Sequence, residues 1–188
     1  MAKKAFRISN LILRAVCFPS IATYRKAFIT YCRPLLEYAT FVWSPCLQKL
    51  ISLVENVQRR FSRRAYARCF PSKEIPCYSD RLALFDLKPL SHRRIYFDLV
   101  LCYKIIFSPN SHPELKGLFK ISNHARRTRS HNFQITPFQS FHNRQLYHSF
   151  ACRVPRIWNK LPCDIFSSLN YFKSSIYKLD LVALSILN

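Results

Sequence analysis

The chain has a single glycine, Gly117, among its 188 residues. Average composition would give roughly 13 glycines in this length. Glycine supplies the left-handed backbone that tight hairpins and phosphate-cradling loops require. Such elements are therefore nearly excluded, and helices joined by turns at the 11 prolines are favoured. The predicted fold class is mainly α.

Apolar residues at helical spacing predict two helices before residue 34. The first covers 5–17, and Ser20 is placed to cap the second, which runs to Pro34. Proline disfavours helix at the preceding residue, so the segment 33–45 is predicted to start or kink there. Its apolar helical face is predicted to contain Leu35, Tyr38, Ala39 and Val42.

Glu37 projects away from that face, so we expect it to be solvated or paired with Arg33. Residues 46–69 form the clearest helix, with one apolar stripe made of Leu47, Leu50, Val54, Val57 and Phe61. We expect Trp43, which lies just before Pro45, to belong to an apolar floor beneath this helix. Ser79 and Ser91 are the predicted caps of two further helices, over 78–87 and 90–107.

We predict a helical, thumb-like bundle over 1–107, a basic polar linker over 108–140 and a smaller helical subdomain over 141–188. Within the linker, a short strand is expected near residues 133–135. In the last part, Trp158 is the predicted core anchor, and Asn159 and Pro162 are predicted structural residues beside it.

The charge of the chain points to a polyanionic partner. It has 30 Lys and Arg against 9 Asp and Glu, a net charge of +21 at pH 7. Self-repulsion of this size is tolerated mainly when a polyanion or an anionic surface is bound. Nucleic acid is the leading candidate, and the rival is a stand-alone basic scaffold that binds protein or an anionic membrane.

The strongest candidate site is the arginine face of the helix 46–69. Arg59, Arg60, Arg63 and Arg64 fall within an arc of about 140°, with Val57 and Phe61 facing away. Guanidinium groups at this spacing suit a phosphate backbone. Arg60, Arg63 and Arg64 have no acid four residues away to pair with them, which favours phosphate contact over an ordinary solvated face.

Other basic residues are weaker candidates for nucleic-acid contact. Arg126, Arg127 and Arg129 lie in the linker with His124 and His131, and the alternative is a disordered basic loop. The adjacent pair Arg93 and Arg94 completes the set of predicted contacts.

Catalytic and metal-binding patterns are lacking. The nine acids are dispersed, without the Asp-Asp pair of metal-dependent nucleotidyl transfer. The eight cysteines contain no Cys-x-x-Cys, and we expect reduced, mostly buried thiols. His142, His148, Cys152 and Cys163 match no usual zinc spacing, and Cys152 with His148 is a weak nucleophile pair. No catalytic residue, metal or cofactor is therefore predicted.

Neither secretion nor membrane insertion is expected. Arg7 and Arg14 interrupt any apolar core of a signal peptide. The most apolar stretch, 95–107, contains Asp98 and Lys104 and is shorter than the roughly 18 residues of a membrane span.

Several segments in one collinear order resemble the region downstream of the catalytic palm in reverse transcriptases of non-LTR, LINE-type (jockey-like) retrotransposons. They are RPLLEYATFVWSP, LISLVENVQRRFSRR, YSDRLALFDLKPLSHRR, DLVLCYKII, RTRSH, SFACRVPRIWNKLP and SSLNYFKSSIYKL. The resemblance covers roughly residues 5–180. At Asp86 and Ser130 the family's pattern usually has glycine.

The resemblance implies the thumb and C-terminal part of an RNA-directed DNA polymerase, without its polymerase or endonuclease active sites. We therefore expect binding of template RNA or an RNA–DNA hybrid, together with the rest of such a polymerase as a partner. The expected location is the nucleus or a cytoplasmic ribonucleoprotein. The alternative is a truncated or decayed copy without function.

We predict that the purified chain neither incorporates nucleotides on a template nor binds metal stoichiometrically. The reason is that it has neither paired carboxylates nor Cys and His at ligand spacing. Primer extension with and without EDTA, together with elemental analysis, tests this. Template-directed incorporation that EDTA abolishes would contradict the prediction.

Overall fold

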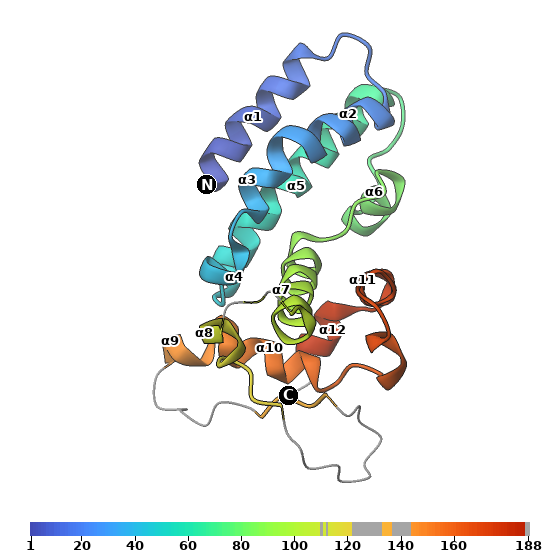
Figure 1. Cartoon of the computed structure of the whole chain (residues 1–188). Coiled ribbons are helices and arrows are strands. Elements are labelled where there is room, and N and C mark those ends of the chain that lie inside the picture. Colours follow the sequence, from blue (N-terminus) through green and yellow to red (C-terminus); the bar gives the residue numbers. More distant parts are fainter. Residues whose placement is uncertain (110, 112, 122–132, 137–143, 187–188) are drawn as a thin grey trace. The chain divides into compact units, whose positions relative to one another are not determined.

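The computed structural model describes residues 1–109, 111, 113–121, 133–136 and 144–186 and is mainly helical (Figure 1). The predicted fold class is thus confirmed. The chain divides into two compact units, one of Met1–Ala39 with Ser44–Arg93 and one of Thr40–Trp43 with Arg94–Asn188. The domain boundary predicted from the sequence is residue 107, the end of a helix, whereas this division falls inside that helix, after Arg93.

The first unit contains α1 (Ala2–Ala15), α2 (Ile21–Ala27), the π-helical turn η1 (Phe28–Cys32), α3 (Arg33–Glu37), α5 (Gln48–Cys69), α6 (Tyr78–Leu84) and the start of α7 (Leu90–Phe107). Ser20 caps α2 as predicted, because its Oγ accepts a hydrogen bond from the Thr23 backbone N–H at 3.1 Å. Ser79 and Ser91 are not caps: α6 begins at Tyr78 and α7 at Leu90.

The turn η1 explains how the chain passes Pro34. Proline has no N–H to donate and its ring crowds the carbonyl one turn earlier. A π-helical turn widens the helix there, so α2, η1 and α3 follow one another without an intervening loop. Arg33 alone separates Pro34 from η1, and the two residues before this proline, Cys32 and Arg33, keep right-handed helical backbone angles.

The predicted apolar face of 33–45 is wrong beyond Glu37. Helix α3 ends before Tyr38, whose ψ of 127° is not helical, and the next residue, Ala39, has a left-handed backbone with φ of 50°. As a result Leu36 is buried, while Tyr38 and Val42 are each 74% exposed. The prediction assumed that one helix continues through Tyr38 and Ala39, where the backbone is not helical.

An aromatic cluster holds α5 in the first unit. Phe61 stacks on Phe28 with ring centroids 4.7 Å apart and meets Tyr24 edge-on at 6.1 Å. Trp43, the predicted floor of this helix, belongs to α4 (Thr40–Trp43) and is grouped with the other unit. The aromatic contacts of Phe61 are therefore made by Tyr24 of α2 and Phe28 of η1, which sequence spacing alone did not pair with α5.

The apolar stripe of α5 is only partly buried. Val54, Val57 and Phe61 are in the core as predicted, but Leu47 and Leu50 are 50% and 44% exposed. The buried face of α5 thus lies along its middle and C-terminal turns.

A left-handed residue closes α6. Asp86 has φ of 46°, and its N–H bonds to the Ala83 carbonyl at 3.0 Å. The Leu87 N–H bonds to the Leu82 carbonyl at 2.9 Å, and both leucines are buried. This is a Schellman termination, whose left-handed position usually carries glycine. Asp86 stands at the place where the resembled family has glycine.

The second unit contains α4, the rest of α7, α8 (Pro113–Lys116), α9 (Arg144–Tyr147), α10 (Phe150–Trp158), the 3₁₀ turn η2 (Cys163–Phe166), α11 (Leu169–Lys178) and α12 (Leu181–Ile186). The segment predicted to be a linker contributes to this core, since Phe119 and Ile135 are 5% and 1% exposed. Ile121 and Ile135 form an isolated antiparallel bridge near the expected strand.

Trp158 and Asn159 fix residues 133–135 onto this core. Trp158 is fully buried, and its Nε1–H donates to the Phe133 carbonyl at 2.8 Å. The Asn159 side chain accepts from the Ile135 N–H at 2.9 Å and donates to the Ile135 carbonyl at 2.8 Å. Pro162 precedes η2 as its N-cap residue. These side chains have the structural role that the sequence predicted.

A buried ion pair ties α4 into the second unit. Asp98 lies 2.8 Å from Arg153 Nε, and Arg153 Nη2 also donates to the Phe41 carbonyl at 2.9 Å. Burial raises the pKa of Asp98, although the neighbouring guanidinium opposes the shift. Breaking such a pair from one side would leave an uncompensated buried charge.

All eight cysteines are free thiols, but most are not buried. Cys32, Cys102 and Cys152 are buried, whereas Cys17, Cys46, Cys77 and Cys163 are exposed. In the described part of the chain we find no group of three potential metal ligands. Likewise, none of the helices described there has the length and apolar character to span a bilayer.

Replacing Trp158 with alanine is expected to lower the free energy of unfolding by about 3–5 kcal/mol, because it removes a large buried ring and the donor to Phe133. Denaturant unfolding followed by circular dichroism measures the change. Tyr171→Ala is the matched control, since Tyr171 is 50% exposed. Equal midpoints for the two variants would contradict the prediction.

Candidate nucleic-acid interface

The predicted arginine face exists on α5. Arg59, Arg60, Arg63 and Arg64 are all exposed, whereas Val57, Phe61 and Ala65 are buried. Lys49 and Arg68 extend this exposed side toward the two ends of the helix. Within the described residues, none of the four arginines forms an ion pair with a carboxylate.

The only acid of α5 is turned into the protein. Glu55 is 8% exposed and accepts a 2.5 Å hydrogen bond from the Tyr78 hydroxyl. Its carboxylate also accepts the backbone N–H of Leu90, the first residue of α7, at 3.0 Å. That N–H has no partner inside its own helix, and the N-terminus of a helix favours negative charge. Glu55 is therefore engaged away from the arginines.

Two further polar residues lie beside Glu55 on the buried side of α5. Gln58 Nε2 donates to the Tyr78 hydroxyl and to the Lys88 carbonyl, each at 3.1 Å. Ser62 Oγ accepts from Arg81 Nε at 3.3 Å, so a buried arginine of α6 is held here. Burial and the Glu55 carboxylate raise the pKa of Tyr78, so that its hydroxyl remains a donor. This polar stripe anchors α6 and the start of α7 to α5.

Each of three arginines on the face is oriented by an uncharged neighbour. The Arg59 guanidinium lies 4.9 Å from the centre of the Tyr78 ring, and that of Arg60 lies 5.7 Å from the centre of the Phe6 ring. Arg64 Nη1 donates to Asn10 Oδ1 at 2.6 Å. These contacts limit side-chain freedom without neutralising the charge.

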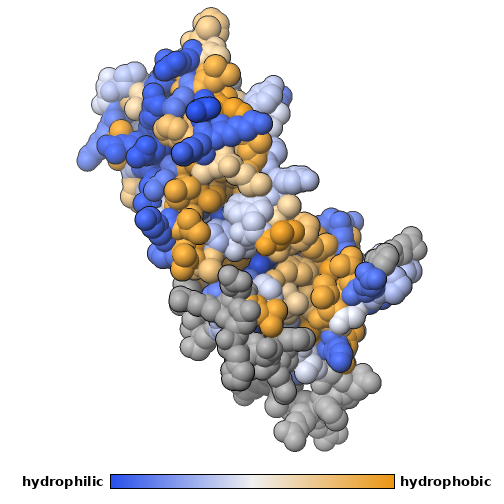
Figure 2. All heavy atoms as spheres, turned by 90° about the vertical axis from the view of Figure 1, so that its left-hand side faces the viewer, coloured by the Kyte–Doolittle hydropathy of each residue, from blue (hydrophilic) through white to orange (hydrophobic). Residues whose placement is uncertain are grey.

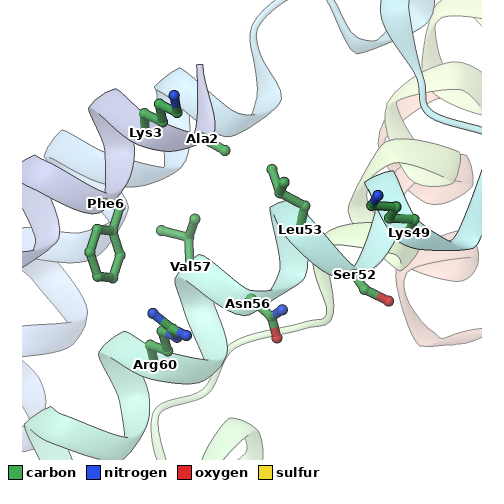
Figure 3. Close-up of a pocket in the computed structure, with 9 residues that line it drawn as sticks. All are labelled: Ala2, Lys3, Phe6, Lys49, Ser52, Leu53, Asn56, Val57 and Arg60. Atoms are coloured by element: carbon green, nitrogen blue, oxygen red, sulfur yellow. The ribbon is translucent and has the colours of Figure 1, made fainter.

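Helix α1 packs against α5 and adds charge to the same surface. Its exposed cations are Lys3, Lys4, Arg7 and Arg14. Figure 2 shows the hydrophilic surface of the first unit, in blue, interrupted by apolar patches in orange. A groove of about 500 Å³ lies between α1 and α5, and in it Phe6, Leu53 and Val57 lie near Lys3, Lys49 and Arg60 (Figure 3). A basic surface with an apolar recess can contact both phosphates and bases.

Arg93 and Arg94 are not part of an exposed basic surface, contrary to the sequence analysis. The Arg93 side chain is 12% exposed and forms two contacts with Glu37, one of them at 2.9 Å from Nη2. Glu37 also pairs with Arg33 at 3.7 Å, as predicted. Arg94 is 3% exposed. Both arginines are within the buried side of α7, which a charge count cannot reveal.

The linker cluster of Arg126, Arg127 and Arg129 lies outside the described residues, as do His124 and His131. The polar stripe of α5 was not predicted from the sequence. Glu55, Gln58 and Ser62 share one side of the helix at spacings of three and four, which was the available signal.

Comparisons with known proteins do not assign a family. The chain is similar to the uncharacterized protein B0403.1 of Caenorhabditis elegans, with 32% identity over 118 residues. The similarity covers 63% of this chain and 59% of that protein, so the chain spans less than two thirds of the relative. No family model and no solved structure matches the chain. The arginine face of α5 is therefore the main indication of function.

Glu55→Ala is expected to destabilise the chain by about 2–4 kcal/mol, because the buried Leu90 N–H and Tyr78 O–H lose their acceptor. Glu74→Ala is the control, since Glu74 is exposed on the same unit and its loss changes the charge equally. Denaturant unfolding compares the two variants. The anchoring role of Glu55 would be wrong if both had the stability of the parent.

Proposed function

We propose that this chain binds nucleic acid through the phosphate backbone, using the arginine face of α5. The observation that carries the proposal is the exposure of four arginines on one helical face without a carboxylate partner among the described residues. Guanidinium groups bind phosphate oxygens through planar, charge-assisted hydrogen bonds. Contacts of this kind give affinity and orientation without reading sequence.

The rigidity of the face supports binding over simple solvation. The helix is anchored by the Phe61 ring contacts and by the Glu55 hydrogen bonds, so the arginines project from a fixed base. The Arg59–Tyr78 and Arg60–Phe6 contacts further reduce the entropy that would be lost on binding. A merely solubilising face would not need its side chains oriented in this way.

The resemblance in sequence indicates the kind of protein to which this chain is similar and the nucleic acid that it would bind. We infer a non-catalytic part similar to the region after the palm of a LINE-type reverse transcriptase, contacting template RNA or an RNA–DNA hybrid. The rest of such a polymerase would be its protein partner. The collinear segments named above support this inference, as does the exposure of the four arginines of VQRRFSRR on α5.

Changing Arg59, Arg60, Arg63 and Arg64 together to glutamine is expected to flatten the dependence of log K on log salt by roughly 3 to 4 units. This follows if each arginine neutralises one phosphate, at about 0.7–0.9 units per contact. Affinity should fall similarly for unrelated RNA sequences, measured by fluorescence anisotropy across a salt series. Glutamine has nearly the helix propensity of arginine, so circular dichroism should not change.

The matched control replaces four exposed lysines of the second unit by glutamine, namely Lys104, Lys116, Lys120 and Lys178. It removes the same charge and should leave the salt slope close to that of the parent. Equal slopes for the parent and the arginine variant would refute the proposal. Stronger binding to vesicles of anionic lipid than to RNA, lost in the same variant, would instead assign the face to membranes.

A further inference from the structure

The groove between α1 and α5 differs from the rest of the basic surface. It is lined on one side by Phe6 and on the other by Leu53 and Val57 (Figure 3). Leu53 remains 50% exposed there, although it is a large apolar side chain. We call this recess of about 500 Å³ the Phe6 groove.

We propose that the Phe6 groove receives an unpaired base of a single-stranded nucleic acid, whose phosphates contact Lys3, Lys49 and Arg60. This inference rests on the proposed function and specifies the class of nucleic acid. All three ionisable side chains that line the groove are cations. The groove therefore complements a ligand that is apolar in one part and anionic in another, as a nucleotide is.

The apolar walls suit the face of a base. Bases stack on aromatic side chains in proteins that bind single strands, and the preference for any one base is weak. Ser52 and Asn56 also line the groove and carry groups that can hydrogen-bond to a base edge. The Arg60 guanidinium near the Phe6 ring is placed to contact the phosphate of the same nucleotide.

A duplex cannot make this contact. Its bases are stacked and paired, so only their edges are accessible from the grooves. Entry of a base between α1 and α5 requires that it be unpaired and turned outward. The Phe6 groove should therefore favour single strands, whereas the arginine face accepts phosphates from either form.

A second recess extends the site along the same pair of helices. It has a volume of about 310 Å³ and is lined by Leu13 and Arg14 of α1 and by Arg64, Ala67 and Arg68 of α5. Val57 and Ala67 are ten residues apart, which is about 15 Å along the helix. With three arginines in its lining, this recess suits the phosphates of neighbouring nucleotides on the strand.

The test compares a single-stranded oligonucleotide with a duplex of the same sequence, using the full chain at one salt concentration. Phe6→Leu keeps an apolar side chain but removes the ring. It should weaken single-strand binding roughly five-fold or more, the lower bound expected for losing one base–aromatic stack. Duplex binding should weaken much less, because a duplex loses only the orientation that the Phe6 ring gives to Arg60. Quenching of a 2-aminopurine oligonucleotide by the protein should also be lost.

Tyr171→Leu is the matched control, because it removes an exposed ring from the other unit and should change neither result. If Phe6→Leu lowers the melting temperature, Leu53→Gln alters the same groove at a half-exposed position and should act in the same direction. An unchanged ratio of single-strand to duplex affinity in the stable variant would overturn the inference.

The outcomes separate this inference from the proposed function. A flattened salt slope in the four-arginine variant, with no effect of Phe6→Leu, would leave phosphate binding intact and refute the base groove. An unflattened slope would refute the proposed function itself. An oligoglutamate peptide with the same charge as the oligonucleotide is the competitor. If it displaced the single strand as efficiently as unlabelled oligonucleotide does, the groove would be assigned to acidic peptides and the inference would be overturned.

Discussion

The first unit depends on the hydrogen bonds that the buried carboxylate of Glu55 accepts from Tyr78 and Leu90. Burying a charge is costly unless hydrogen bonds replace its lost water. Here the Tyr78 hydroxyl, the Leu90 N–H and the positive end of α7 provide that replacement. One side chain thus joins α5 to α6 and to the first turn of α7, and the same contacts remove the only acid of α5 from its surface.

Helix α5 consequently has three sides with separate tasks. The apolar side, centred on Phe61, packs on α2 and η1, and the polar side holds α6 and α7. The third side carries the arginines, whose mutual repulsion is small in water, about 1 kcal/mol for two charges 4 Å apart. The contacts that anchor α5 on its other two sides outweigh this repulsion, so the helix can carry closely spaced cations. A bound polyanion would relieve the repulsion between them.

Local rules predicted the features that depend on one helix alone. These include the Ser20 cap, the exposed arc of Arg59 to Arg64 and the burial of Trp158. Features that depend on tertiary partners were missed. The left-handed Ala39 ends a periodic pattern that looks continuous, and Glu55 is apparent as an anchor only when Tyr78 and Leu90 are placed beside it. The nucleic-acid contacts of Arg126, Arg127 and Arg129 remain a prediction from sequence, because these residues lie outside the described part of the chain.

Charge density alone does not locate a nucleic-acid interface in a chain this basic. Arg93 and Arg153 are as cationic as Arg60, yet they pair with Glu37 and Asp98, whose side chains are 11% and 6% exposed. Those two acids and Glu55 all point into the protein, so three of the nine acidic side chains of the chain make internal contacts. Because Glu37 and Asp98 are mostly buried together with Arg93 and Arg153, these pairs leave the net charge of the surface unchanged. The arginines without acidic partners are therefore the candidates for binding an external anion.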